Sequence, residues 1–586
     1  MNEAFVQQST TGRWLRFDSP QQIMETHLPE DILPMLREIE CLVEKNNWYA
    51  VGFVSYEAAS GFDSALRVRT HAAVPDSLPL LYFALYNAPE ILPTFQCLSA
   101  IRAEVAETTN PPDIWVPSMD RATYGLAIDA IRKHIAQGDT YQVNYTWRLR
   151  RQFTGEPRRW FEEMVGSQCA QHAAYLDTGR FIILSVSPEL FFSLNDRRLI
   201  TRPMKGTAAR APAPVTDTAR AAALRESVKD RAENVMIVDM MRNDLSRIAT
   251  LGSVQVSRLF AIEQYPTVWQ MTSTVEATTD HPVSAILRAL FPAASVTGAP
   301  KANTMRIIAD LETTPRGLYT GAIGIIAPGH RAEFNVAIRT VVLDHATGVA
   351  EYGVGGGIVW DSETGAEYAE CLTKAQVLWT RRPRFALLET LLWTPLNGFS
   401  LLEEHLERIS GSADYFGYPL DLGKMRQALS DLAAGFPSSP QRVRLRLDED
   451  GMIRTESTLL GEGTSEVSLT LAASAIDSSN PFFYHKTTHR AEYERARRES
   501  PKGADVLLWN ERGEITETTI ANVVVELDGK RITPPVTAGL LAGTYRRRLL
   551  EEGAIREETI QRTDLPRASA LWVINSVRGW RRAVLV

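Results

Sequence analysis

The sequence predicts two domains, an α+β domain in the N-terminal two thirds of the chain and an α/β domain in the remainder. The length of 586 residues exceeds what one ordinary hydrophobic core accommodates. The segment 378–384 is basic, contains proline and lacks periodicity, as linkers do. After it, strand and helix patterns alternate more regularly. We therefore expect domains at 1–377 and 385–586, joined by a linker at 378–384.

The composition excludes several classes of function. Lys and Arg number 63 against 70 Asp and Glu, and the net charge of -7 offers no basic surface for nucleic acid or an anionic membrane. No segment sustains the roughly 18 apolar residues of a membrane span, and the N-terminus lacks a signal-peptide pattern. We therefore expect a cytoplasmic protein that binds small molecules or other proteins. Four scattered cysteines without CxxC spacing argue against a disulfide framework or a zinc site: Cys41, Cys97, Cys169 and Cys371.

Local patterns predict the elements of the first domain in order. Short apolar runs between Pro-rich breaks predict strands up to about residue 110, and a helix is expected at 121–137 before Gly138. Two strand-like runs are broken at Ser187-Pro188. Further expected elements are a helical stretch at 216–245, strands at 321–326 and 333–343, and a helix at 363–378.

The segment Thr201–Thr207 places Lys205 in a turn bounded by Pro203 and Gly206. A lysine in a loop is usually a solvated surface residue. A lysine amine can also be a nucleophile, and this alternative gains weight from the motifs around it.

Two pairs of carboxylates occur at helical spacing. Asp230 and Glu233 are three residues apart on one predicted helix, and Glu367 and Glu370 are three apart on another, so each pair shares a face. One such pair is typical of a solvated helix surface. Two converging pairs could hold a hard cation such as Mg²⁺ together with a carboxylate-bearing substrate.

Four motifs, with the lysine segment, resemble the signature set of chorismate-utilising enzymes across most of residues 1–380. They are Lys229–Asn234, Thr297–Lys301, Asn335–Thr340 and Gly355–Val359. The resemblance implies a large antiparallel β-sandwich flanked by helices. Within the family, Pro203–Thr207 is similar to the aminodeoxychorismate synthase component I branch, in which lysine stands where anthranilate synthases carry alanine.

The resemblance also implies roles for the matching residues. Lys205 would attack C2 of chorismate as the C4 hydroxyl departs, and ammonia would then enter at C4 and expel the lysine. The amine must be neutral, which positive neighbours such as Arg202 and Arg210 would favour. Gln270 stands where anthranilate synthases carry histidine, so pyruvate elimination is not expected in this domain. The other implied residues are Glu189 as general acid or base, Thr207 as a hydrogen-bond donor, Glu233, Glu367 and Glu370 as Mg²⁺ ligands, and Arg339, Tyr319, Gly355, Gly356, Lys374 and Thr297 as substrate-binding residues.

The second domain resembles class IV aminotransferases, which use pyridoxal 5'-phosphate. The similarity lies in His405–Ile409, Glu517–Asn522 and Gly539–Arg546, and in Lys486, which would otherwise read as a solvent-facing lysine at a strand end. It implies PLP fold type IV with two subdomains. Lys486 would form the Schiff base and Glu517 would pair with the pyridinium nitrogen. Residues implied for the cofactor phosphate are Arg408, Gly543, Thr544 and Ser576, and Thr390 would assist proton transfer.

Several functions share the motifs of the second domain: transaminases, D-amino acid aminotransferases and 4-amino-4-deoxychorismate lyases. Fusion to a domain that makes aminodeoxychorismate favours the lyase, and hence a bifunctional enzyme that makes 4-aminobenzoate for folate. A different class IV transaminase or a non-catalytic module remain alternatives. The sequence has no Gly-Cys-Gly elbow, so either a separate glutamine amidotransferase subunit or free ammonia would supply nitrogen. Class IV relatives commonly form dimers, so a homodimer through this domain is expected.

Overall fold

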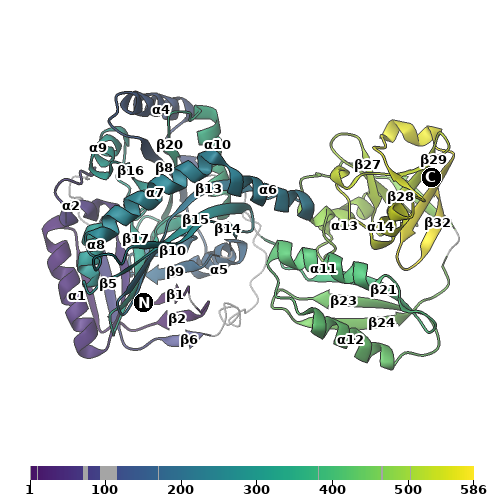
Figure 1. Ribbon diagram of the computed structural model, residues 1–586, viewed down its shortest axis with the longest axis horizontal. Helices are drawn as coiled ribbons and strands as arrows, with labels where there is room; N and C mark the ends of the chain where they lie inside the picture. The colour runs from purple at the N-terminus through teal and green to yellow at the C-terminus, as the bar shows by residue number, and fades with distance from the viewer. Residues whose placement is uncertain are drawn as a thin grey trace. The chain divides into compact units, whose positions relative to one another are not determined.

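The computed structural model describes residues 2–9, 11–69, 77–92, 115–168, 170–379, 382–463, 466–501 and 503–586. The chain divides into two compact units, one of Met1–Ala208 and Ala223–Arg382, the other of Ala209–Ala222 and Pro383–Val586 (Figure 1). The division near residue 382 falls in the expected linker, of which residues 380–381 lie outside the described residues. Cys97 and Cys169 also lie outside them. The grouping of residues 209–222 with the second unit has no counterpart in the sequence pattern.

The first unit contains two ten-stranded sheets. One has the order β16-β8-β20-β19-β10-β9-β1-β2-β6, with β7 beside β8. Its strands are β1 (Ala4–Gln7), β2 (Trp14–Phe17), β6 (Glu90–Leu92), β7 (Val116–Pro117), β8 (Gln142–Gln152), β9 (His172–Asp177), β10 (Phe181–Ser187), β16 (Gly298–Ala299), β19 (Thr340–Asp344) and β20 (Val349–Ile358).

The other sheet has the order β13-β15-β12-β11-β18-β17-β4-β5-β3, with β14 beside β15. Its strands are β3 (Gln22–Thr26), β4 (Tyr49–Val54), β5 (Leu81–Tyr86), β11 (Leu190–Asn195), β12 (Arg198–Arg202), β13 (Met204–Ala209), β14 (Gln255–Gln264), β15 (Val268–Thr278), β17 (Ala322–Ala327) and β18 (Arg331–Val336).

The two sheets pack face to face. Residues from one face of each sheet share a hydrophobic core between the sheets, and the alternate residues of the same strands point to other cores. Val51 and Phe53 of β4 share a core with Ala4 and Val6 of β1 in the other sheet, whereas Phe5 faces away from it. The predicted sandwich flanked by helices is confirmed. Outer faces are covered on one side by α1 (Ile32–Asn46), α2 (Ala59–Phe62), α7 (Val228–Ser246) and α8 (Val283–Leu290), and on the other by α4 (Arg121–Ala136), α5 (Pro157–Gln168), α9 (Lys301–Leu311) and α10 (Thr364–Ala375).

Three local predictions differ from the structure. The helical stretch 216–245 is two helices, α6 (Pro214–Glu226) and α7, because Ser227 between them is extended and caps α7 by accepting from the Asp230 N–H. The expected strand 333–343 is two strands, β18 and β19, separated by Arg339 at φ +50°. Lys205 lies in strand β13 rather than in a turn. The strand continues through this segment because the Pro203 carbonyl accepts from the Ser273 N–H of β15.

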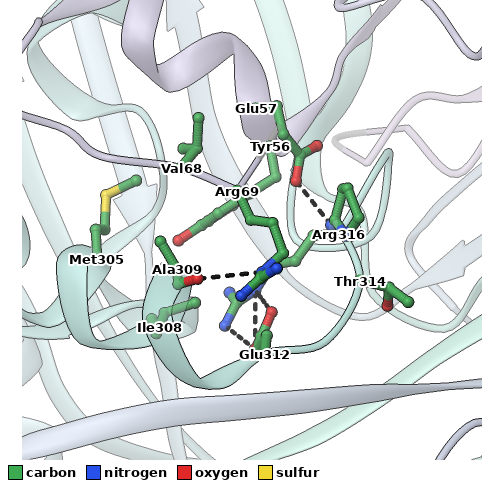
Figure 2. Close-up of a pocket in the computed structure, with 11 residues that line it drawn as sticks. Tyr56, Glu57, Val68, Arg69, Met305, Ile308, Ala309, Glu312, Thr314 and Arg316 are labelled. Carbon is green, nitrogen blue, oxygen red and sulfur yellow. Dashed lines mark hydrogen bonds and ion pairs between the residues drawn. The ribbon is translucent and has the colours of Figure 1, made fainter. Parts of the chain in front are cut away.

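A buried hydrogen-bond network around the ion pair of Arg316 and Glu312 joins segments of the first unit that lie far apart in sequence (Figure 2). Arg316 Nη2 lies 2.7 Å from Glu312 Oε1, and neither side chain is more than 4% exposed. The same guanidinium donates to the carbonyls of Val296 and Asn144, the second of which is in β8. Glu57 accepts from the Arg316 N–H at 2.7 Å. This network therefore fixes β8 against the segment that leads into Thr297.

We expect Glu312→Gln to lower the free energy of unfolding of the first unit by about 3 to 5 kcal/mol, because it leaves the buried Arg316 charge without a counter-charge. The measurement is urea unfolding of the full chain, followed by a probe of the first unit. Glu38→Gln makes the same chemical change on the exposed face of α1 and serves as the control. Equal midpoints for the two variants would show that the pair contributes nothing to stability.

The second unit contains two sheets, as two subdomains require. A four-stranded antiparallel sheet, β22-β21-β23-β24, packs against two helices. An eight-stranded mixed sheet has the order β27-β26-β25-β32-β31-β28-β29-β30. The elements of the first subdomain are β21 (Leu387–Thr394), β22 (Gly398–Phe399), β23 (Gln441–Leu447), β24 (Ile453–Leu459), α11 (Leu402–Phe416) and α12 (Leu422–Ala434). Those of the second are β25 (Glu466–Leu471), β26 (Asp505–Trp509), β27 (Ile515–Thr518), β28 (Asn522–Leu527), β29 (Lys530–Thr533), β30 (Arg556–Glu557), β31 (Ala570–Asn575), β32 (Gly579–Leu585), α13 (Ala491–Arg498) and α14 (Thr544–Glu551).

Within the described ranges, no helix combines the length and apolar character that crossing a bilayer demands.

Candidate active sites

Lys205 is the centre of the candidate site in the first unit. Its Nζ lies 3.4 Å from Glu233 Oε2 on α7, and both side chains are about one fifth exposed or less. Gln270 of β15 holds the lysine strand, because its Nε2 donates to the Gly206 carbonyl at 2.8 Å and its Oε1 accepts from Thr207 Oγ1 at 3.0 Å. The structure thus brings together the predicted residues Lys205, Glu233 and Thr207 with Gln270.

The glycine-rich strand β20 passes directly beside this amine. A Cβ on Gly357 would lie 2.5 Å from Lys205 Nζ and would also clash with Gln142. A Cβ on Gly356 would lie 3.2 Å from Glu367 Oε2. Only glycine therefore lets the backbone approach these side chains closely. The Gly355 carbonyl accepts from Lys374 Nζ at 3.1 Å.

Gln142 is a site residue that the sequence motifs did not identify. It is 1% exposed, and neither its Oε1 nor its Nε2 has a hydrogen-bond partner among the described residues. An unsatisfied buried amide is costly, so it points to a ligand that completes its hydrogen bonds. The local sequence carries no signal for it, because β8 also contains other polar residues, such as Asn144, Thr146 and Arg148.

The predicted metal ligands are not gathered into one cluster. Glu370 lies 2.8 Å from Lys374 Nζ, and Glu367 accepts from Ser362 Oγ at 2.6 Å. Burial raises the pKa of Glu370, but the charge and hydrogen bond of Lys374, with the charges of Lys205 and Lys229, together outweigh burial, and the pKa is lowered. The described part of the chain holds no group of three or more His, Cys, Asp or Glu side chains arranged for a metal. The donor chemistry nevertheless suits Mg²⁺, which needs only one or two protein carboxylates when water and substrate oxygens complete its shell.

Glu189 has the properties of an acid-base group. It is 4% exposed, lies between β10 and β11, and accepts from Ser295 Oγ at 2.6 Å. Burial raises the pKa of Glu189 to about 7, although hydrogen bonds from Ser295 and the Met204 backbone and the Lys205 charge oppose the shift. A carboxyl group with this pKa can donate or accept a proton at neutral pH.

Arg339 has a cationic, partly buried side chain. Its Nη1 donates to Gln168 Oε1 at 2.7 Å, and no carboxylate of the described residues forms an ion pair with it. Burial lowers the pKa of Arg339. A partly buried guanidinium that lacks a counter-charge among the described residues favours an anionic ligand.

The remaining predicted residues of the first unit have local partners. Tyr319 packs its ring against Gly353 rather than against Gly355 or Gly356. The Thr297 hydroxyl donates to the Ala293 carbonyl at 3.2 Å. These contacts of Tyr319 and Thr297 are with the protein backbone, and their substrate-binding roles stay predictions. The expected positive neighbours of Lys205 are themselves paired, Arg202 with Glu263 at 3.7 Å and Arg210, in the second unit, with Asp217 at 2.7 Å.

A cavity of about 570 Å³ in the second unit brings together the residues that the class IV motifs implied. Lys486 has its carbonyl anchored to β21 by the Leu388 N–H, and burial followed by the Arg408 charge lowers the pKa of Lys486 to about 8. A larger share of the amine is therefore neutral near neutral pH. The predicted residues that line the cavity are Thr390, Arg408, Lys486, Glu517, Gly543, Thr544 and Ser576.

Glu517 is held by two donors, Tyr493 Oη at 2.7 Å and Asn522 Nδ2 at 3.3 Å. Burial raises the pKa of Glu517 to about 7. A positively charged ring nitrogen beside it would favour the carboxylate form, which suits its predicted role.

The start of α14, at Gly543 and Thr544, also lines the cavity and suits a phosphate. The first backbone amides of a helix have no partner within it, and the helix dipole favours an anion there. A Cβ on Gly543 would clash with Asn522 Oδ1, so only glycine fits at this position. Arg408 is oriented by Glu389 through bonds of 2.8 Å and 2.6 Å, and His405 Nδ1 lies 2.6 Å from the same carboxylate. The sequence motifs did not identify Glu389. Its place at an inward-facing position of the apolar strand β21 is the signal that could have indicated a buried, paired carboxylate. The nucleophilic lysine, the buried carboxyl and the phosphate-binding helix start fit pyridoxal phosphate.

Comparison with known proteins agrees with this geometry. Residues 2–380 match the family model of chorismate binding enzymes, and residues 386–586 match that of class IV aminotransferases. Aminodeoxychorismate synthase component 1 of Escherichia coli is 39% identical over 262 residues, which are 44% of this chain and 57% of that protein. Anthranilate synthase component 1 of Streptomyces coelicolor is 36% identical over 270 residues, 45% of this chain and 52% of that protein. The chain thus spans little more than half the length of these relatives.

The fold has a solved counterpart. Anthranilate synthase component I from Streptococcus pneumoniae superposes with a TM-score of 0.54 at 24% identity, covering 62% of this chain and 92% of that one. A class IV aminotransferase domain implies pyridoxal phosphate as cofactor. The chain therefore belongs to the chorismate binding enzyme family, and it carries a class IV aminotransferase domain over residues 386–586.

Proposed function

We propose that the chain makes 4-aminobenzoate from chorismate in two steps, amination at C4 in the first unit and pyruvate elimination in the second. The observation that carries the proposal is the Lys205 amine beside Glu233, Gly357 and the unsatisfied Gln142, in a chain that also holds the Lys486 cavity. The curated relatives named aminodeoxychorismate synthase component 1 support the first step.

In the first step, Lys205 Nζ forms a bond to C2 of chorismate, both ring double bonds shift by one position towards C4, and the C4 hydroxyl leaves as water with a proton from Glu189. Ammonia then attacks C4, both double bonds shift back, and the Lys205 amine is released. Arg339 binds one substrate carboxylate through its guanidinium. Glu233 holds the ammonium form of Lys205 and can accept its proton before attack.

Mg²⁺ belongs to the proposal for this site. Glu367 and Glu370 on α10, with Glu233 on α7, would hold the ion once they exchange their present lysine and serine partners. The ion would supply positive charge at a substrate carboxylate and fix the ring in place. Loss of aminodeoxychorismate formation on chelation, with recovery on adding Mg²⁺, is the check.

In the second step, the bound cofactor supplies an electron sink for the elimination. Lys486 removes the ring proton that becomes acidic, and Thr390 lines the same cavity where it can assist the transfer. Glu517 holds the ring nitrogen, and Arg408 with the start of α14 holds the phosphate. Aromatisation of the ring drives the loss of pyruvate.

Product analysis tests the whole proposal. Purified protein supplied with chorismate, ammonia, Mg²⁺ and pyridoxal phosphate should yield 4-aminobenzoate and pyruvate. Without pyridoxal phosphate it should accumulate 4-amino-4-deoxychorismate. Accumulation of that compound despite full cofactor loading would instead indicate a different class IV transaminase in the second unit.

We also infer the source of ammonia and the assembly. A separate glutamine amidotransferase subunit would deliver ammonia to the first unit, in keeping with relatives named component 1. A homodimer through residues 386–586, acting in the cytoplasm, completes the proposal. Glutamine-dependent activity that appears only with the added subunit, and sedimentation at twice the chain mass of 65.3 kDa, are the expected results.

The first step should slow as pH rises through about 7, because Glu189 acts as an acid and is half protonated near its raised pKa of about 7. The rate is measured at a constant concentration of free NH₃, so that ammonia titration does not mask the effect. Glu189→Gln should be at least about 100-fold slower and should lack this inflection. A rate that rises through the same pH would make Glu189 a base, and an unchanged inflection in the variant would remove it from catalysis.

A further inference from the structure

The cavity of the second unit is strongly cationic. Eight arginines and Lys486 line it, and Glu517 is the one carboxylate among its lining residues. Several of these arginines have partners: Arg408 pairs with Glu389, Arg546 with Glu557, and Arg490 with the Thr519 carbonyl. The arginines without such partners leave more positive charge in the cavity than the cofactor phosphate would neutralise.

Arg578 and Arg581 carry much of this remaining charge. No carboxylate of the described residues forms an ion pair with either, and Arg581 Nε is buried without a hydrogen-bond partner there. Burial lowers the pKa of Arg581, and the Arg578 charge lowers it further, whereas the Asp505 charge opposes the shift without outweighing it. Two guanidinium groups that interact in this way repel each other, and an anion bound between them removes that cost.

Arg578 and Arg581 line the same cavity as Lys486 and Thr390. Ser576, two residues before Arg578, donates through Oγ to the Thr390 carbonyl at 3.4 Å. Thr390 stands opposite Arg444 in the β21–β23 register, and Arg444 is already paired with Glu456 at 3.1 Å. Arg578 and Arg581, which have no ion-pair partner among the described residues, are therefore the arginines of this cavity best placed to bind an anion.

We propose that Arg578 and Arg581 together bind one carboxylate of the substrate and thereby select a dicarboxylate ring amine over simple amino acids in the second unit. This inference rests on the proposed lyase function. A planar carboxylate accepts two parallel hydrogen bonds from a guanidinium, and a second guanidinium adds charge without new steric demands.

The test uses cofactor-loaded full-length protein and 4-amino-4-deoxychorismate supplied directly. Arg578→Gln and Arg581→Gln should each raise KM about tenfold or more, with kcat changed by less than about threefold, because a charge-assisted bond is lost from binding. Arg582→Gln is the matched control, since Arg582 is the next residue on β32, is exposed and does not line the cavity. The visible absorption band of the cofactor should be the same in all four proteins.

A second readout does not depend on turnover. Chorismate has the same carboxylates but no amine, so it should inhibit the lyase step competitively, and this inhibition should weaken about tenfold in the Arg578 and Arg581 variants only. A wild-type protein that makes no 4-aminobenzoate from supplied aminodeoxychorismate overturns the proposed function, and the inference with it. An active wild type whose KM and chorismate inhibition are unchanged by both substitutions overturns the inference alone.

Discussion

Replacement of Lys205 by alanine should abolish formation of 4-amino-4-deoxychorismate, with a loss of about 10³-fold or more. The covalent route needs an amine at this position, and Lys205 Nζ is the amine that lies against Gly357, 2.5 Å from where a Cβ would stand. The rate is measured with ammonia as nitrogen source, so that delivery from a partner subunit plays no part. Chorismate binding should be largely retained, because Arg339 and Gln142 are untouched.

The control for this variant is Lys45→Ala, which removes an exposed lysine from the last turn of α1. It should leave the rate unchanged. Lys205→Ala should also still convert supplied aminodeoxychorismate to 4-aminobenzoate, because the second unit is intact. If the variant continued to aminate chorismate at near the wild-type rate, the covalent route would be wrong and Lys205 would be a positioning residue.

Replacement of Lys486 by alanine should abolish the second step and leave the first step intact, the reverse of the result expected for Lys205→Ala. Formation of 4-aminobenzoate should fall by about 10³-fold or more, while chorismate is still converted and 4-amino-4-deoxychorismate accumulates. The amine is both the attachment point of the cofactor and the base, so one substitution removes both roles. The visible absorption band of the lysine-bound cofactor should disappear, which is measured without substrate.

Lys530→Ala, at an exposed lysine of β29, is the matched control and should retain the absorption band and both activities. Retention of 4-aminobenzoate formation by Lys486→Ala would refute the assignment of the cofactor lysine. Loss of both steps would show that the substitution disturbs more than the second site, a result that circular dichroism of the variant would resolve.

The sequence by itself determined the two families and the order of the units, and it predicted the residue types of both candidate sites. Lys205, Gln270, Lys486 and Glu517 lie in contiguous motifs, and the chemistry of an amine, an amide or a carboxyl does not depend on distant partners. The helix at Arg121–Ala136 was likewise predictable, because Asp120 caps it locally and Gly138 follows its end.

Only the tertiary structure decided which groups lack partners and which groups are satisfied. Gln142 and Arg581 gained meaning because burial leaves the Gln142 amide and Arg581 Nε without hydrogen-bond partners among the described residues, and no local motif reports this. The same holds for Lys205, which the sequence placed in a turn. Pairing with β15 extends the strand through it, so the amine projects beside Gly357 of a strand about 150 residues away in the chain. Local sequence specifies chemistry, whereas long-range packing sets distance, burial and charge balance.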